Sequence, residues 1–304
     1  METVKLLITG ICGRLGRAVA AEAASRGWSV TGIDRRPWPA ESRPPKGVEI
    51  HLGELEDTGL LNRIAGGATR LVHTSGLHGE NLKSHDLSAF LRVNVENVAR
   101  LLEWGEEKGI AHFCLSSTMD IVVGRRWKAS GAAVLDESAP LQCDSAYGIS
   151  RALMERLAAE FSRHRDLSIG VLRLMSFGYC ADEELGTALL ARRLACRDAA
   201  RATIHTVLTD GLKGEVFHIG PKTPLTNTDI ANALKNPEEV LEKYFPGATR
   251  IAEKAGFQLA PEMFWPVAAI GKARRLLGWE PLYTFETWLK AHGWAQGVST
   301  NFEG

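Results

Sequence analysis

The chain opens with Val4-Lys5-Leu6-Leu7-Ile8-Thr9-Gly10-Ile11-Cys12-Gly13-Arg14-Leu15-Gly16, and this stretch decides the fold. A short apolar run of strand length leads into glycines spaced Gly-x-x-Gly-x-x-Gly, and residues 17–24 are typical of a helix. Glycines at such a corner let the backbone turn tightly, approach a pyrophosphate and pack the helix close to the strand. A phosphate would lie at the positive end of the helix dipole, against free N–H groups. The stretch therefore predicts dinucleotide binding.

A second predicted strand, residues 27–34, ends in Asp34, which lies 24 residues after Gly10. This is close to where a ribose-binding carboxylate is expected, and it favours NAD because a 2′-phosphate would meet a negative charge. Arg35 and Arg36 follow directly. Either guanidinium could pair with a 2′-phosphate or stack on adenine, or both could be exposed loop residues. We therefore expect NAD, with NADP as the alternative.

The composition is that of a soluble globular protein, with 304 residues, 45% hydrophobic and 24% charged. Lys+Arg and Asp+Glu balance at 36 each, so neither nucleic acid nor a membrane is indicated as a partner. The five cysteines are scattered and the histidines lack a metal-ligand spacing, so we expect no disulfide and no metal. With no apparent leader or membrane-spanning run, we expect a cytoplasmic protein.

Strands and helices alternate through the first half of the chain. Strands are predicted at residues 48–52, 70–76 and 111–116, and helices at 59–65 and 86–108. This alternation predicts a doubly wound parallel sheet. After the third strand, Glu54 could meet the adenine amino group or lie in a solvated turn. The small residues Thr74, Ser75 and Gly76 end the fourth strand and would let a cofactor ribose approach the backbone.

Hydroxyl groups gather at the end of the fifth strand, in Ser116, Ser117 and Thr118. The carboxyl end of a central strand lies over the crevice where such sheets bind ligands. Tyr147 and Arg151 stand four residues apart at the start of a predicted helix, so they share one face of it. A fixed cation beside a tyrosine stabilises the phenolate, which allows proton exchange near neutral pH.

At these residues the chain resembles the extended short-chain dehydrogenases/reductases of the NAD-dependent epimerase/dehydratase family, over nearly its whole length. The marks of the resemblance are Thr9 with its glycine triplet, Val93-Asn94-Val95 with Asn97, Ser116-Ser117-Thr118, Tyr147, Arg173, and the late stretch from Lys272 to Pro281. The family generally has a lysine four residues after the tyrosine, where this chain has Arg151. An arginine keeps the positive charge but cannot pass on a proton as an ammonium can.

The resemblance implies that Tyr147 transfers the proton and that Thr118, or failing it Ser117, hydrogen-bonds the reacting oxygen. Arg151 would contact the nicotinamide ribose. The implied function is NAD(P)-dependent oxidoreduction or epimerisation of a hydroxylated small molecule, such as a sugar, sugar acid or nucleotide sugar. The alternatives are a catalytically weak or silent NAD(P)-binding sensor or scaffold, and a ketone reductase of a lipophilic substrate. The expected cofactor-binding residues are Gly10, Gly13, Arg14, Leu15, Gly16, Asp34, Arg35, Glu54, Leu55, Thr74, Ser75, Gly76, Asn94, Tyr147 and Arg151.

The second half of the chain is expected to add a small, mostly helical C-terminal substrate domain. We predict a dinucleotide-binding domain at residues 1–175, with 198–220 returning to it, and a substrate-binding cap at 176–197 and 221–304. The family's proline- and glycine-rich nucleotide-sugar loop is absent after the sixth strand, at residues 175–182. The paired Arg192 and Arg193, and the basic loop 125–128, could contact a substrate or be solvated. Family members often dimerise through the helices at 94–108 and 147–164 here, so we expect a homodimer.

Overall fold

A computed structural model describes residues 4–124, 134–178 and 180–295, so the basic loop 125–128 lies outside the described residues. Its centre is a sheet of parallel strands in the order β3-β2-β1-β4-β5-β7-β8. The order reverses between β1 and β4, which is the switch point where doubly wound sheets bind ligands. The predicted fold class is confirmed. The strands are β1 (Lys5–Thr9), β2 (Ser29–Asp34), β3 (Val48–Leu52), β4 (Arg70–His73), β5 (His112–Thr118), β7 (Ser168–Leu174) and β8 (Lys213–Ile219).

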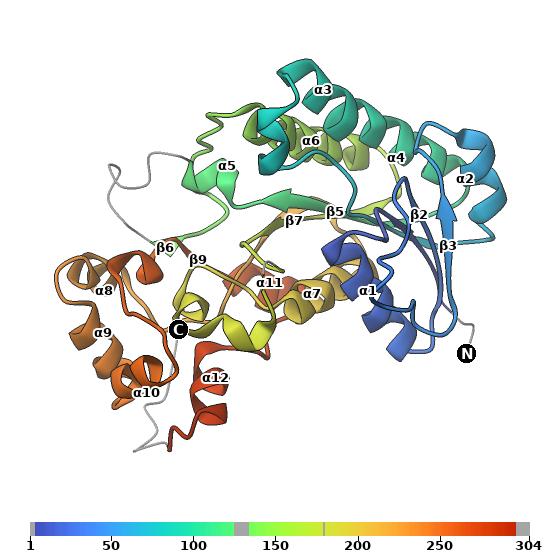
Figure 1. Cartoon of the computed structure of the whole chain (residues 1–304). Coiled ribbons are helices and arrows are strands. Elements are labelled where there is room, and N and C mark those ends of the chain that lie inside the picture. The colour runs from blue at the N-terminus through green and yellow to red at the C-terminus, as the bar shows by residue number, and fades with distance from the viewer. Residues whose placement is uncertain (1–3, 125–133, 179, 296–304) are drawn as a thin grey trace.

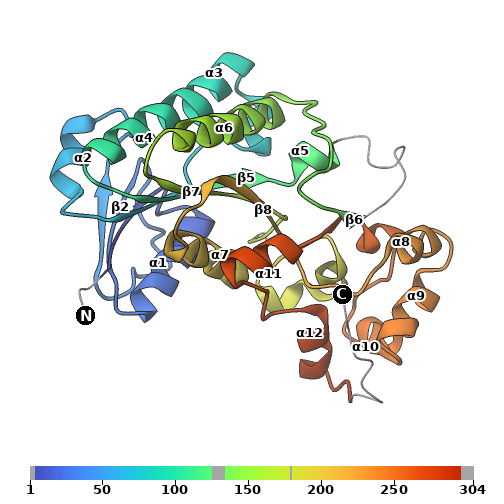
Figure 2. The ribbon, with the colours of Figure 1, turned by 180° about the vertical axis from the view of Figure 1, so that it is seen from behind.

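Helices cover both faces of this sheet (Figures 1 and 2). One layer holds α2 (Thr58–Ile64), α3 (Leu87–Leu91), α4 (Asn97–Glu107) and α6 (Ala146–Arg163). The opposite layer holds α1 (Arg14–Ser25), α7 (Cys196–Leu208) and α11 (Gly271–Leu277). Each layer of helices encloses a hydrophobic core with one face of the sheet, and alternate strand residues belong to different cores. Leu7 packs with the first layer, while Leu6 and Ile8 pack with the second. None of the described helices is long and apolar enough to cross a membrane.

The predicted helix at 86–108 is interrupted. Between α3 and α4 the chain makes a π-helical turn, Arg92–Glu96. The buried Asn94 lies on this turn, and its side chain accepts from the backbone N of Leu77 and donates to the Leu77 carbonyl and the Ser150 hydroxyl, each at 2.9 Å. Such turns widen a helix locally at places where a side chain has a specific role. An apolar stripe alone could not reveal this one, because the stripe runs through it unbroken.

The C-terminal part forms a cap beside the carboxyl end of the sheet (Figure 1). Its core is rich in aromatic residues, including Trp265 and Trp288. Trp279 instead packs in the main core, and its Nε1 donates to the Asp198 carbonyl at 3.1 Å. The remaining helices are α5 (Asp120–Val123), which precedes the cap, and α8 (Asn227–Ala233), α9 (Pro237–Tyr244), α10 (Ala248–Lys254) and α12 (Phe285–Ala291).

A short parallel ribbon, missed in the sequence, joins β6 (Val134–Leu135) to β9 (Val267–Ala268). Two-residue strands are too short to show an alternating pattern. The ribbon lies where the cap meets the sheet domain, and it brings residues from the first half of the chain against the cap (Figure 2). The division of the chain into two domains at the predicted boundaries stays a prediction. All five cysteines are free thiols.

Candidate active site

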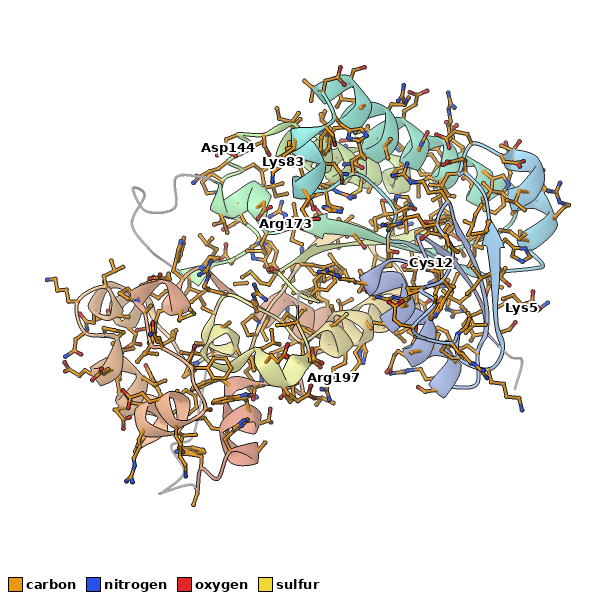
Figure 3. The ribbon with its side chains drawn as sticks, in the orientation of Figure 1. Lys5, Cys12, Lys83, Asp144, Arg173 and Arg197 are labelled. Carbon is orange, nitrogen blue, oxygen red and sulfur yellow. The ribbon has the colours of Figure 1, made fainter. Side chains whose placement is uncertain are left out.

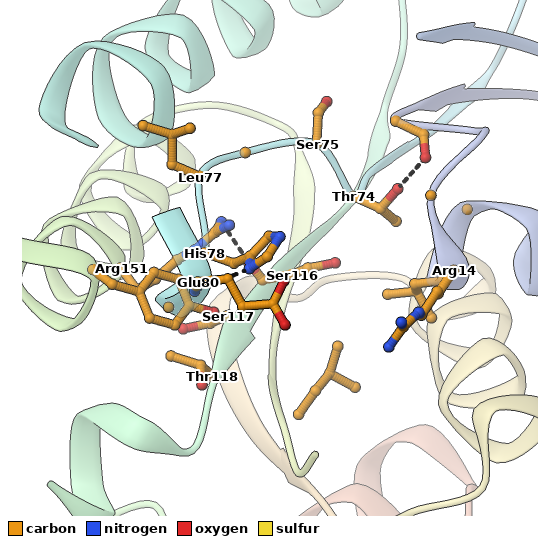
Figure 4. A pocket seen from close by; sticks show the side chains of 18 of the residues that line it. Arg14, Thr74, Ser75, Leu77, His78, Glu80, Ser116, Ser117, Thr118 and Arg151 are labelled. Carbon is orange, nitrogen blue, oxygen red and sulfur yellow. Dashed lines mark hydrogen bonds between the residues drawn. The ribbon is translucent and has the colours of Figure 1, made fainter. Parts of the chain in front are cut away.

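A cavity of about 1440 Å³ opens at the carboxyl end of the sheet, and it gathers nearly all of the predicted site residues. Its lining includes the glycine corner, Asp34, the small residues after β4, the hydroxyls at the end of β5, Tyr147 and Arg151. Figure 4 shows Arg14 on one side of it, with Ser117, Thr118 and Arg151 grouped on the other. Of the residues expected to bind the cofactor or to take part in catalysis, Asn94 alone is not part of the lining. It lies buried behind the wall, where it holds Leu77 and Ser150.

The glycine corner requires glycine at two of its three positions. Gly10 has φ of +78°, and a Cβ atom there would lie 2.6 Å from the backbone N of Ser75. A Cβ atom at Gly16 would lie 2.2 Å from the Gly10 carbonyl oxygen. Gly13 is the N-cap of α1, and no side chain caps this helix. The first turn of α1 therefore lies at the cavity wall with no side-chain cap among the described residues, as a pyrophosphate site needs. The residues present fit a dinucleotide.

Asp34 binds the glycine corner and leaves room for a ribose. Its Oδ2 accepts from the backbone N of Cys12 and its Oδ1 accepts from the backbone N of Arg36, both at 3.0 Å. The carboxylate is 8% exposed, on the cavity wall. A carboxylate has about four acceptor sites, so two ribose hydroxyls could still donate to it. Arg35 and Arg36 are exposed at the rim, and Glu54 and Leu55 line the cavity nearby.

The small residues after β4, Thr74, Ser75 and Gly76, line the cavity. The Thr74 hydroxyl lies 2.9 Å from the carbonyl oxygen of Thr9 and 3.1 Å from that of Gly10, and Figure 4 shows this side chain beside the glycine corner. Ser75 also lines the cavity, but its hydroxyl is buried and has no hydrogen-bond partner among the described residues. A Cβ atom on Gly76 would lie 2.6 Å from Nη2 of Arg151 and 2.7 Å from Oδ1 of Asn94. Glycine at position 76 is what allows Arg151 to approach the cavity.

Arg151 is 5% exposed, and half of its head group is already engaged. Its Nη1 donates to the carbonyl of Ser116 at 2.9 Å, and its Cζ lies 5.5 Å from the centre of the Tyr147 ring. Its Nε is buried and finds no partner in the part of the chain that the structure describes. Tyr147 is half-buried, in the first turn of α6, and within the described residues its hydroxyl has no hydrogen-bond partner. A fixed cation thus lies beside a free phenol.

The two candidate hydroxyls at the end of β5 differ in their hydrogen bonds. Ser117 donates its only hydroxyl proton to Oε1 of Glu155, at 2.6 Å. Thr118 Oγ1 instead accepts from the backbone N of Asp120, at 3.2 Å. Its proton has no acceptor in the part of the chain that the structure describes. Because a hydroxyl has one proton to donate, Thr118 can donate to a ligand while Ser117 cannot without giving up Glu155.

Sequence reasoning missed several polar residues beneath this site. His73 is fully buried, its Nδ1 lies 2.7 Å from the Thr9 hydroxyl, and its Nε2 has no partner within residues 4–124, 134–178 and 180–295. Burial, with a smaller contribution from Arg151, lowers the pKa of His73 to about 3. Glu155 and His218 also went unnoticed. Glu155 carried a usable signal, because it stands four residues after Arg151 and so lies beside it on one face of α6.

The fold and the cavity together define an extended short-chain dehydrogenase/reductase. The model of the NAD dependent epimerase/dehydratase family matches residues 6–179, and the chain belongs to this family. The predicted family is therefore confirmed. Family membership also makes the chain an NAD-dependent enzyme of the epimerase, dehydratase or dehydrogenase kind, with NAD as the cofactor.

Individual relatives are distant. The chain is 26% identical over 260 residues to a dTDP-glucose 4,6-dehydratase of Streptomyces antibioticus, covering 76% of each chain. In an alignment 332 positions long, it is 22% identical to a 3 beta-hydroxysteroid dehydrogenase/Delta 5-->4-isomerase of Mycobacterium tuberculosis, covering 93% of this chain and 88% of the other. A solved structure of MoeE5 with UDP-glucose and NAD superimposes with a TM-score of 0.65 and 21% identity, covering 94% and 99% of the two chains. This structural likeness shows the fold.

Proposed function

We propose that this protein uses NAD to oxidise, reduce or epimerise a hydroxylated small molecule at a carbinol carbon. Tyr147 would be the acid/base, and Thr118 would donate a hydrogen bond to the reacting oxygen. The observation that carries the proposal is the pairing of two free hydroxyls, on Tyr147 and Thr118, in one cavity with a glycine corner suited to a pyrophosphate.

Each side chain has a separate task. NAD, when bound, supplies a site that accepts or returns a hydride. Tyr147 takes the proton of the substrate hydroxyl, and the Arg151 guanidinium lies nearby, with its Cζ 5.5 Å from the centre of the Tyr147 ring. Thr118 holds the oxygen as it gains carbonyl character. Nη2 of Arg151 has no hydrogen bond within the described residues, so it can donate to a ribose hydroxyl.

A sugar-derived substrate is the class we propose. The named activities of the dTDP-glucose dehydratase relative and the UDP-glucose bound to MoeE5 support it. The wall of the cavity toward the cap carries Phe177, Arg192, Trp265 and Pro266. Arg192 would suit an anionic group, either the phosphate of a nucleotide sugar or the carboxylate of a sugar acid. The 3 beta-hydroxysteroid dehydrogenase relative keeps a lipophilic substrate as the alternative.

The test is turnover with a panel of compounds. Purified protein with NAD⁺ or NADH is given UDP-glucose, dTDP-glucose, UDP-glucuronate, free hexoses, uronates and a hydroxysteroid. Cofactor absorbance and product chromatography are followed together, because an epimerase returns its hydride and leaves absorbance unchanged. We expect conversion of at least one sugar compound, and its loss in a Tyr147→Phe protein that still binds NAD⁺ in calorimetry. Turnover of none by the wild-type protein, or full activity in Tyr147→Phe, would contradict the proposal.

One observation favours a second candidate, a silent NAD-binding protein. Arg151 replaces the usual lysine, and its Nη1 is held by the Ser116 carbonyl. A protein of this kind would bind NAD⁺ in calorimetry yet convert nothing in the panel. Binding and turnover measured on the same preparation therefore separate the two candidates.

A further inference from the structure

A chain of buried polar side chains runs from the end of β5 into the interior. The Ser117 hydroxyl donates to Oε1 of Glu155 at 2.6 Å. Arg173, on β7, donates to the same carboxylate through Nε and Nη2, with Nη2 2.8 Å from Oε2. Both charged side chains are 6% exposed. A buried, bidentate pair of this kind fixes the relative position of its two elements, since any displacement leaves a charge unpaired.

The chain continues to His218 on β8. Nη1 of Arg173 lies 3.3 Å from Nε2 of His218, and Nδ1 of His218 lies 3.0 Å from the carbonyl oxygen of Leu135. A guanidinium only donates and a carbonyl only accepts, so the imidazole must be neutral with its proton on Nδ1. Burial lowers the pKa of His218, which agrees with this neutral form. His218 is thus a directional link between Arg173 and the Leu135 carbonyl.

The Leu135 carbonyl belongs to the ribbon at the base of the cap. This carbonyl also accepts from the backbone N of Ala269, at 2.8 Å, directly after the two residues of β9 that pair with β6. The residues just before β9, Trp265 and Pro266, line the cavity wall. The polar chain therefore begins at Ser117, which lines the cavity, and ends at the ribbon that directly follows Trp265 and Pro266 on the cavity wall. Figure 3 labels Arg173 between the layer of α6 and the cap.

We propose that Glu155 and Arg173 are positioning residues that, through His218, couple the cap wall to the strand end that carries Ser117 and Thr118. Contact of a substrate with the wall at Trp265 and Pro266 thereby affects the position of the Thr118 hydroxyl. Ser117 serves as the anchor of this chain at the strand end. The effect on catalysis rests on the function proposed above, whereas the mechanical coupling does not.

The first experiment measures the coupling without any substrate. Backbone hydrogen exchange is followed at Ala269, whose N–H bonds to Leu135, in the NAD⁺-bound protein. In Arg173→Lys the side chain ends in a single ammonium group, which cannot donate to both oxygens of Glu155 and also contact His218. We expect Ala269 to exchange about tenfold faster in this variant, with amides of α9 unchanged. Arg197→Lys is the matched control, because Arg197 makes exposed ion pairs with Asp182 and Glu183.

A second variant guards against loss of folding. His218→Ala leaves the Glu155–Arg173 pair intact, removes the link to Leu135, and should also speed exchange at Ala269. Unchanged exchange at Ala269 in a folded Arg173→Lys or His218→Ala protein would overturn the coupling. Equal acceleration in Arg197→Lys would overturn it too, because the effect would then be general.

The second experiment reads the consequence for catalysis, with whichever sugar compound the wild-type protein converts. We expect His218→Ala to lower kcat about tenfold, since small misplacements of reacting groups are costly, while the Kd for NAD⁺ stays within about twofold. Rescue by His218→Gln, whose side chain can again accept and donate, would support the positioning role. An unchanged kcat in His218→Ala would overturn it. Absence of wild-type turnover would reject the proposed function, and the exchange result would still decide the coupling.

Discussion

The Oδ2 atom of Asp34 lies 3.0 Å from the backbone nitrogen of Cys12, so the carboxylate at the end of β2 holds the backbone of the glycine corner in place. Its second oxygen holds the backbone of Arg36 in the same way. One side chain on the cavity wall therefore fixes the backbone of the glycine corner, where we expect the pyrophosphate, and would itself face the adenosine ribose. A change at this position should affect cofactor binding through both routes.

We expect Asp34→Asn to raise the Kd for NAD⁺ by about tenfold to a hundredfold, because hydrogen bonds to a charged group contribute about 1.5–3 kcal/mol. Isothermal titration calorimetry measures this directly. Asp57→Asn is the matched control, since Asp57 caps α2 away from the cavity and asparagine caps helices equally well. Wild-type affinity in Asp34→Asn would show that this carboxylate does not hold the ribose.

Gly16→Ala should disrupt the corner sterically. The added methyl would lie 2.2 Å from the Gly10 carbonyl oxygen, so the loop must move. We expect a loss of about 1–3 kcal/mol in the free energy of unfolding and no measurable NAD⁺ binding. Gly271→Ala, where nothing lies within 4 Å of the added atom, should change stability by less than about 0.5 kcal/mol. Urea unfolding and calorimetry on both variants test the difference.

The fold and the placement of the glycine corner and Asp34 follow from local sequence. Each sheet strand is a short apolar run, and the corner and Asp34 lie within one strand–helix–strand unit, so their meeting at one cavity can be predicted from spacing. The choice between Ser117 and Thr118 could not be derived in this way. It depends on the register that places Ser117 beside Arg173 and on the packing of Glu155 from α6. Those contacts join residues distant in the sequence, and no local pattern records them.

The acid side of the stability profile should depend on His73. Burial lowers the pKa of this imidazole from 6.5 to about 3. Between these two pH values His73 is protonated in the unfolded chain and neutral in the folded chain. Its contribution to stability is therefore complete above about pH 6.5 and is lost as the pH falls toward 3. At about 1.4 kcal/mol per pH unit, the wild-type protein should lose about 2 kcal/mol from this residue between pH 7 and pH 5.

Urea unfolding of the wild-type protein and of His73→Asn at both pH values isolates this contribution. His218 and His112, whose pKa values burial also lowers, are present in both proteins and cancel in the comparison. We expect His73→Asn to be less stable at pH 7 but to lose less stability on acidification. Equal losses in the two proteins would mean that His73 is not held neutral by burial.

Arg151→Lys tests the departure from the family pattern. A lysine keeps the charge and can take part in proton exchange, so we expect kcat to increase, by up to about tenfold. The Ser116 carbonyl loses its donor, so stability should fall by about 1 kcal/mol. Steady-state kinetics and urea unfolding measure the two effects. A lower kcat in Arg151→Lys would show that this cavity has adapted to the guanidinium, and absence of activity before and after would favour the silent protein.

The predicted homodimer can be tested on the outer face of the layer that holds α4 and α6, which lie side by side in both views (Figures 1 and 2). Leu153 on α6 is 47% exposed, and Leu87 at the start of α3 is 42% exposed. Light scattering should give twice the 33.2 kDa of one chain. Leu153→Glu should then produce monomers, because an unpaired carboxylate in an apolar interface is costly to desolvate. Leu282→Glu is the control, since Leu282 is 61% exposed but lies in the segment between α11 and α12. A wild-type mass of one chain, or equal dissociation by both variants, would show the predicted interface to be wrong.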